Sequence, residues 1–197
     1  MADSLLQQMR NSVGDVYEKI DTVISDIPAE WRNQLNAFKT KANQFSSLYT
    51  TLQSKSATAA KNPALNQQYN ALMMQGSVIQ RTVMDLMTKM GAALSSINGM
   101  SGLGVLPLIP IAAVAAATYA LTSWGNQAIV MIGQLDTVDK AIAAGADPNK
   151  IAAQASDNIQ KQTTGSIFDQ ASGLIKWGIA GVALYLLFPH LKKLLRK

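Results

Sequence analysis

The amino-acid sequence predicts an all-α protein in which antiparallel, heptad-patterned N-terminal helices precede two transmembrane helices joined by a helical connecting segment. Apolar residues recur in steps of three and four over residues 6–90, two long apolar segments follow, and basic residues end the chain. We divide the chain into a helical bundle (1–98), a first apolar segment (99–125), a connecting segment (126–170) and a second apolar segment with a basic tail (171–197).

Three heptad stripes predict the three N-terminal helices. Apolar residues spaced by three and four fall on one face of a helix, and antiparallel neighbours bury such faces against each other. Between the second and third stripes, residues 54–61 are polar or small, which indicates a connection. The stripes consist of Leu6, Met9, Val13, Val16, Ile20, Val23 and Ile27, then Trp31, Leu35, Phe38, Ala42, Phe45, Tyr49 and Leu52, then Leu65, Tyr69, Leu72, Gly76, Ile79, Val83, Leu86 and Met90.

Proline and capping residues mark the expected ends of the helices. Pro28 follows the first stripe, and a proline disfavours helical conformation at the residue before it. Asn62 and Pro63 supply a capping side chain and a proline at the first helical position. Asp147 and Pro148 repeat this pattern and predict a helix that begins there.

Charged residues are missing from the middle of the chain. No Asp, Glu, Lys, Arg or His lies between Lys89 and Asp136, and only 15% of all residues are charged, where an ordinary soluble domain has about a quarter. The net charge of +5 is concentrated in residues 171–197, which hold basic but no acidic residues. We therefore expect something other than water to face the middle stretch.

Two apolar segments match the length of a membrane span. Residues 102–124 are free of charge, and prolines in their first half are tolerated in membrane helices when neighbours satisfy the freed carbonyls. Residues 171–191 contain the run WGIAGVALYLLF and one charge, Lys176, whose stem can extend to the interface. Both segments are thus predicted to enter a bilayer.

The flanks of the two segments predict their orientation. Two spans place the N-terminal bundle and the basic tail on the same side, cytoplasmic or particle-interior, with the lysine-poor loop opposite, as the positive-inside rule requires. Trp124 then closes the first span and Trp177 opens the second, so that both indoles lie at one membrane interface together with Lys176. These three residues are the predicted membrane-interface site.

The basic tail has two candidate ligands. Lys192, Lys193, Arg196 and Lys197 lie within the last six residues. Each basic residue near an anionic lipid surface contributes about 1 kcal/mol, and the same residues can neutralise nucleic-acid phosphates. A plain stop-transfer anchor without a ligand is a third reading of the same residues.

Catalytic chemistry finds little support in the residue types present. Cysteine is absent, His190 is the one histidine, and no phosphate-binding glycine motif occurs. The acidic residues of the heptad helices, such as Asp15 and Asp85, occupy polar positions typical of a solvated surface. We therefore expect a non-enzymatic protein with no catalytic residue, cofactor, metal or small-molecule substrate.

Three functions fit these patterns. The first is a membrane-anchored structural or assembly protein, such as a minor component of a virion or secretion-type particle. The second is an oligomeric α-helical pore-former or conduit for macromolecules, and the third is a soluble helical scaffold that buries its apolar segments against partner chains. The expected partners are a lipid bilayer, further copies of the chain or a larger assembly, and nucleic acid through the basic tail.

Overall fold

The computed structural model describes residues 2–23, 29–95 and 111–163. Every secondary-structure element in these ranges is an α-helix, which confirms the predicted all-α class for the described residues. The helices are α1 (Ala2–Val23), α2 (Ala29–Ser54), α3 (Ser56–Ala59), α4 (Pro63–Ser95), α5 (Ile111–Ala143) and α6 (Pro148–Thr163).

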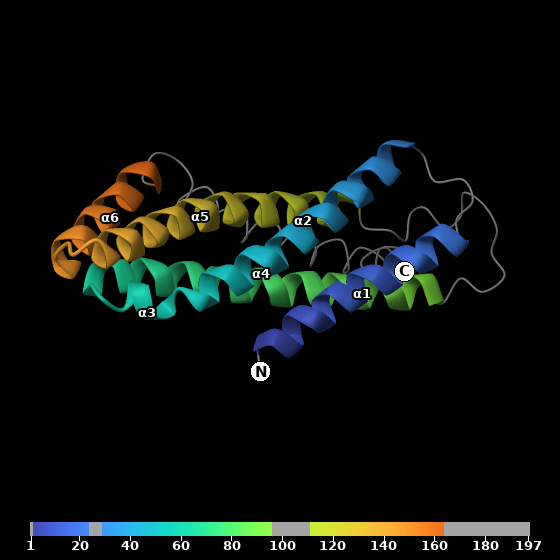
Figure 1. Cartoon of the computed structure of the whole chain (residues 1–197). Coiled ribbons are helices and arrows are strands. Elements are labelled where there is room, and N and C mark those ends of the chain that lie inside the picture. The colour runs from blue at the N-terminus through green and yellow to red at the C-terminus, as the bar shows by residue number, and fades with distance from the viewer. Residues whose placement is uncertain (1, 24–28, 96–110, 164–197) are drawn as a thin grey trace, which may run out of the picture.

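The long helices form one elongated bundle (Figure 1). Successive long helices run in opposite directions, so α2 and α5 are parallel to each other and antiparallel to α4. The most extensive contact joins α2 to α5, while α1 packs mainly on α4 and also on α2. Helix α6 folds back on α5 and also touches α4. Helix α5 thus lies between neighbours from both the beginning and the end of the chain.

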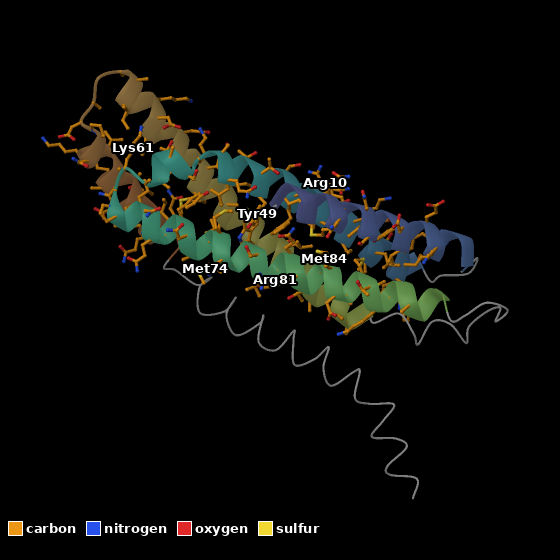
Figure 2. All side chains as sticks on the ribbon, turned by 90° about the horizontal axis from the view of Figure 1, so that it is seen from below. Arg10, Tyr49, Lys61, Met74, Arg81 and Met84 are labelled. Atoms are coloured by element: carbon orange, nitrogen blue, oxygen red, sulfur yellow. The ribbon has the colours of Figure 1, made fainter. Side chains whose placement is uncertain are left out.

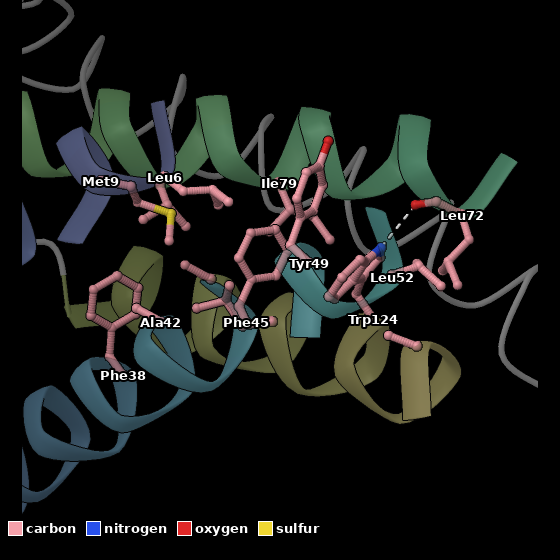
Figure 3. Packing of buried hydrophobic residues seen from close by; sticks show 14 of the residues in the cluster. Leu6, Met9, Phe38, Ala42, Phe45, Tyr49, Leu52, Leu72, Ile79 and Trp124 are labelled. Atoms are coloured by element: carbon pink, nitrogen blue, oxygen red, sulfur yellow. Dashed lines mark hydrogen bonds between the residues drawn. The ribbon is translucent and has the colours of Figure 1, made fainter. Parts of the chain in front are cut away.

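The heptad stripes form the hydrophobic core. Every stripe residue from Leu6 to Ile20, from Leu35 to Leu52 and from Leu65 to Met90 is buried, and Trp31 is half-buried. Figure 3 shows how residues of α1, α2, α4 and α5 meet in one cluster. Fully burying a Val, Leu or Phe side chain contributes about 1.5–3 kcal/mol. The stripes therefore supply the main stabilisation of the bundle.

Both predicted capping residues act as expected. The Asn62 side chain accepts hydrogen bonds from the backbone N–H groups of Ala64 and Leu65 at 3.0 and 3.1 Å, and α4 begins at Pro63. The Asp147 carboxylate accepts one from the N–H of Asn149 at 2.9 Å, just ahead of α6. These bonds satisfy donors that have no partner within the helix.

The connection between α2 and α4 is more structured than its composition indicates. Residues 56–59 form the short helix α3, and Thr58 and Ala59 are buried. The connection predicted over 54–61 does join the second and third stripes, and it contains one helical turn. The small and polar residues of this connection form no apolar stripe, so periodicity does not predict a helix there. A single helical turn can still form when it packs against neighbouring helices.

Helix α5 joins two segments that the sequence divided at residue 125. Its buried residues recur in steps of three and four from Ala113 to Val138, so one apolar stripe continues through Trp124 and Ala128 without a break. Among the helices of the described ranges, none combines the length and the apolarity that a membrane crossing requires. Residues 96–110, which include the start of the predicted first apolar segment (99–125), and residues 164–197, which include the predicted second segment, lie outside the described residues.

Candidate interaction surface

The outer face of α5 carries no charge over most of its length. Its exposed residues between Ile111 and Leu135 are formally neutral, because the first charged residue of the helix is Asp136. Their spacing of three, four or seven places them along one side of the helix. We call the following residues the uncharged face of α5: Ala112, Ala115, Tyr119, Asn126 and Ile129.

Large apolar side chains are exposed on this face and on α4. Tyr119 and Ile129 are 50% and 49% exposed, and Met74 and Val78 on α4 are 71% and 45% exposed. In Figure 2, Met74 lies on the outside of α4. Within the described ranges, the exposed large hydrophobic side chains all belong to these two helices. Single exposed apolar residues are common on soluble proteins, so the feature that distinguishes this surface is the lack of charge along α5.

The opposite side of α5 is sealed against α2 and α4 by Trp124. Its side chain is 1% exposed, and its ring centroid lies 4.5 Å from that of Phe45 and 5.8 Å from that of Tyr49. The indole Nε1–H donates a hydrogen bond of 2.9 Å to the backbone carbonyl of Leu72 on α4 (Figure 3). The polar atom of Trp124 is thus satisfied inside the protein, as a buried indole requires.

Gly76 allows α4 to approach this aromatic cluster closely. A β-carbon at Gly76 would lie 2.8 Å from Cε2 of Tyr49 and 3.0 Å from two carbons of the Trp124 indole. The hydroxyls of Tyr49 and Ser77 share a hydrogen bond of 2.9 Å, which fixes the other end of the tyrosine ring. Helices α2, α4 and α5 therefore pack closely against one another on the side of α5 opposite the uncharged face.

An ionic cluster marks the point on α5 where charge returns. Lys55, just after α2, places its Nζ 2.6 Å from Oδ1 of Asp136 and 3.1 Å from Oδ2 of Asp139. The hydroxyl of Thr58 in α3 donates a hydrogen bond of 2.7 Å to Oδ1 of Asp139. These contacts join the α2–α3 corner to the C-terminal part of α5.

The pKa values in this cluster shift in the directions that favour the charged forms. Hydrogen bonds to Asp136 and then to Asp139 raise the pKa of Lys55 above its usual value. The hydrogen bond from Thr58, followed by that from Lys55, lowers the pKa of Asp139. Because the two carboxylates are more than a third exposed, solvent screening keeps the contribution of each ion pair to stability below about 1 kcal/mol.

Helix α6 covers only the C-terminal part of α5. It turns back at Gly145, whose φ of +89° suits a residue without a β-carbon, and it has 16 residues against the 33 of α5. Its apolar side, including Ala152 and Ile159, is buried. Gln68 of α4 donates to the carbonyl of Ser156 at 3.2 Å, which ties α6 to α4. The N-terminal half of α5 lies beyond the reach of α6.

The structure places one of the sequence-predicted site residues, and it differs from the prediction. Trp124 was expected at a membrane interface, but its ring lies in the core of the bundle. The reason is that its position belongs to the apolar stripe that faces α2 and α4, where Gly76 leaves room for an indole. The remaining predicted site residues, which are Lys176, Trp177, Lys192, Lys193, Arg196 and Lys197, lie outside the described residues.

Sequence reasoning missed both the ionic cluster and the exposed apolar residues of the uncharged face. Asp136 and Asp139 are three residues apart, which indicates one helix face, but nothing in the sequence identifies Lys55 as their partner. Tyr119 and Ile129 stand within a charge-free stretch, where the absence of charged residues leaves no clear distinction between the inner and outer sides of the helix.

The described residues offer no cluster of three His, Asp or Glu side chains that could hold a metal ion. No protein-family model, curated protein or solved structure shows significant similarity to the chain. The uncharged face, the sealed junction beneath it and the ionic cluster at its end are therefore the features on which a function can be argued.

Proposed function

We propose that this protein is a non-enzymatic structural or assembly protein whose helical bundle is held at a lipid bilayer by its C-terminal region, residues 171–197. The observation that carries the proposal is that residues 2–163 bury the heptad stripes and Trp124 among themselves. The apolar segment 171–191 is a further long apolar stretch of the chain that carries a single charge. A further environment must therefore keep it from water, and a bilayer is one that its length fits.

The C-terminal region has the chemistry of a membrane anchor. Its apolar segment has the roughly 20 residues needed to cross a hydrocarbon core of about 30 Å. Lys176 lies near the start of the segment, where a lysine can reach the interface at reduced cost. The basic residues that follow, from Lys192 to Lys197, suit anionic lipid headgroups. Both properties favour attachment through the end of the chain.

The packing of α5 changes the proposed topology. Part of the predicted first span, residues 111–124, lies in the bundle, so the proposal uses one membrane segment in place of a hairpin. A single span puts the bundle and the basic tail on opposite sides of the bilayer, where a hairpin would put both on one side. A basic tail that has crossed the bilayer is free to contact lipid headgroups or nucleic-acid phosphates there.

Flotation on vesicles tests the anchor. The full chain should float with vesicles of phosphatidylcholine and phosphatidylglycerol and stay with them in high salt, whereas the chain ending at residue 170 should remain in the dense fractions. Replacing Lys192, Lys193, Arg196 and Lys197 by Gln should weaken initial binding but leave salt resistance, because insertion depends on the apolar segment. A full chain that does not float would overturn the proposal.

The uncharged face favours one alternative, a helical scaffold that associates with other protein chains. Tyr119 and Ile129 offer apolar area without a charged residue within one turn on α5 that would have to be desolvated. Light scattering of the full chain without detergent and vesicles distinguishes the two functions. The scaffold is supported if the full chain forms a defined oligomer, if changing Tyr119 and Ile129 to Asp lowers the mass of that oligomer, and if the chain does not bind vesicles.

A pore formed by the predicted hairpin receives less support from the packing. Residues 111–124 would have to leave the bundle, which removes Trp124 from Phe45 and breaks its hydrogen bond to Leu72. Such a transition exposes much of the core that α5 completes. Vesicles loaded with a self-quenched dye should therefore stay sealed when the full chain binds them.

A further inference from the structure

The direction of α6 brings the end of the described chain toward the uncovered half of α5. Helix α6 runs antiparallel to α5 from the turn at Gly145 (Figure 1). With 16 residues at about 1.5 Å each, it can reach at most about halfway along α5. Helix α6 therefore ends on the side of the C-terminal half of α5, and residues 164–197 follow it in the chain.

The lengths of the following segments match the uncovered part of α5. Residues 164–170 can span at most about 25 Å when extended. A helix built from residues 171–191 would be about 31 Å long, and the stretch of α5 from Ile111 to Asn126 is about 24 Å long. The apolar segment can therefore reach the uncovered half of α5 and run along all of it.

The surfaces are chemically matched. The uncharged face exposes two small residues, Ala112 and Ala115, beside the ring of Tyr119. The segment 171–191 contains small residues at Gly178, Ala180 and Gly181 and carries its one charge near its start. Small residues let two helices approach closely, and no charged residue on this half of α5 would lose its water.

We propose that, when no bilayer is present, the apolar segment 171–191 lies along the uncharged face of α5 in the same molecule. The inference rests on the proposed function, because the same segment is the one assigned to the membrane. A short connection gives an intramolecular contact an effective concentration in the millimolar range, so even a weak contact is populated. The uncharged face and the bilayer then compete for one segment, and the chain remains soluble until it meets lipid.

Cysteine cross-linking tests this contact without background, because the chain has no cysteine of its own. Tyr119→Cys is combined, one at a time, with cysteines at positions 178 to 184 in the full chain. Under mild oxidation without lipid, we expect a disulfide within one molecule, with a yield that rises and falls every three to four positions. Adding vesicles of phosphatidylcholine and phosphatidylglycerol before oxidation should lower that yield at least tenfold.

A matched control replaces Tyr119 by the exposed Lys140 near the C-terminal end of α5. Lys140→Cys combined with the same positions should give little disulfide, because it lies about 31 Å along the helix from Tyr119, beyond the uncharged part of α5. Circular dichroism of each variant establishes that the helices are retained. Cross-linking no stronger than this control overturns the inference, and so does a disulfide that forms only between two molecules, which would assign the face to a second copy.

Flotation of the same variants separates this inference from the proposed function. A protein that floats but shows no intramolecular disulfide keeps the anchor and loses the contact with α5. A protein that forms the disulfide but does not float loses the anchor and shows the segment to be a permanent part of the bundle, which also overturns the proposed competition.

Discussion

The two sides of α5 differ in what surrounds them. On the inner side, Trp124 is buried against Phe45 and Tyr49 and donates a hydrogen bond to Leu72. On the outer side, Tyr119 is half exposed on a face without charge. A single charge-free stretch of sequence thus serves two environments, one closed within the bundle and one open. A charge-free stretch of sequence therefore indicates an apolar environment, but it does not tell whether protein or lipid provides that environment.

The largest expected effect on stability comes from removing the Trp124 ring on the inner side of α5. Trp124→Ala should lower the free energy of unfolding by about 3–5 kcal/mol, the range for removing a buried large aromatic side chain. Trp124→Phe should lose less, because a ring remains beside Phe45 while the hydrogen bond to Leu72 is lost. Urea denaturation followed by circular dichroism measures both. Tyr119→Ala is the outer-side control and should change stability by less than about 0.5 kcal/mol.

The next effect concerns the space between α4 and the inner side. Gly76→Ala should destabilise the bundle by about 1–3 kcal/mol, because the new β-carbon meets two buried rings. The higher helix propensity of alanine offsets up to about 1 kcal/mol of this loss. Gly133→Ala in α5 is a matched control, since a β-carbon there meets nothing within 4 Å. The control should gain stability, and equal effects at both glycines would contradict the close approach at Gly76.

A smaller effect concerns the ionic cluster where the uncharged face ends. Because the pKa of Asp139 is lowered in the folded protein, its ionised carboxylate stabilises the fold above about pH 4, the pKa of an aspartate in the unfolded chain. This contribution is lost as pH falls through the pKa of Asp139 in the folded protein. The raised pKa of Lys55 stabilises the fold below about pH 10 and ceases to do so as pH rises through its folded value. Asp139→Asn should therefore lower stability by up to about 1 kcal/mol near pH 7.

The difference between the wild-type chain and Asp139→Asn should shrink as pH falls below about 4, because the aspartate of the unfolded chain then binds a proton, and it should vanish only below the lowered folded-state pKa of Asp139. Thermal unfolding at several pH values gives this comparison. Asp85→Asn is the control, because Asp85 pairs with Lys89 on the exposed surface of α4. An equal loss for the two variants at pH 7 would show that the cluster on α5 contributes no more than an ordinary surface pair.

The smallest effect on stability is expected on the outer side. Tyr119→Asp should change the free energy of unfolding by less than about 0.5 kcal/mol, because the side chain is 50% exposed. It should nevertheless speed the binding of the full chain to vesicles, since a carboxylate on the face weakens its hold on the segment 171–191. Stopped-flow fluorescence of labelled vesicles measures this rate. Unchanged binding would count against the competition between face and bilayer.

Much of the bundle could be predicted because helical periodicity and capping are local properties. The stripe positions from Leu6 to Ile20 and from Leu65 to Met90 are buried, and Asn62 and Asp147 cap the helices that follow them. Each of these features depends on residues within a few positions of one another. Local patterns therefore defined the helices and their inward sides.

Which helices and side chains pack against each other could not be predicted from local patterns. Lys55 meets Asp136 and Asp139 from more than 80 positions away in the chain. The space for the Trp124 ring depends on Gly76 in another helix, so the sequence favoured a membrane interface for a side chain that the bundle encloses. The uncharged face remained hidden because the inner and outer sides of residues 111–135 are both apolar or neutral.

The pairing of α2 with α5 determines when the core can be completed during synthesis of the chain. The most extensive contact of α2 is with a helix that ends at Ala143, although α4 is its next long neighbour along the chain. A nascent chain that has released only α1 to α4 from the ribosome lacks the Trp124 ring that packs against Phe45 and Tyr49. The aromatic cluster is therefore completed only after α5 emerges, and until then the partly built core has the exposed apolar surface that favours chaperone binding.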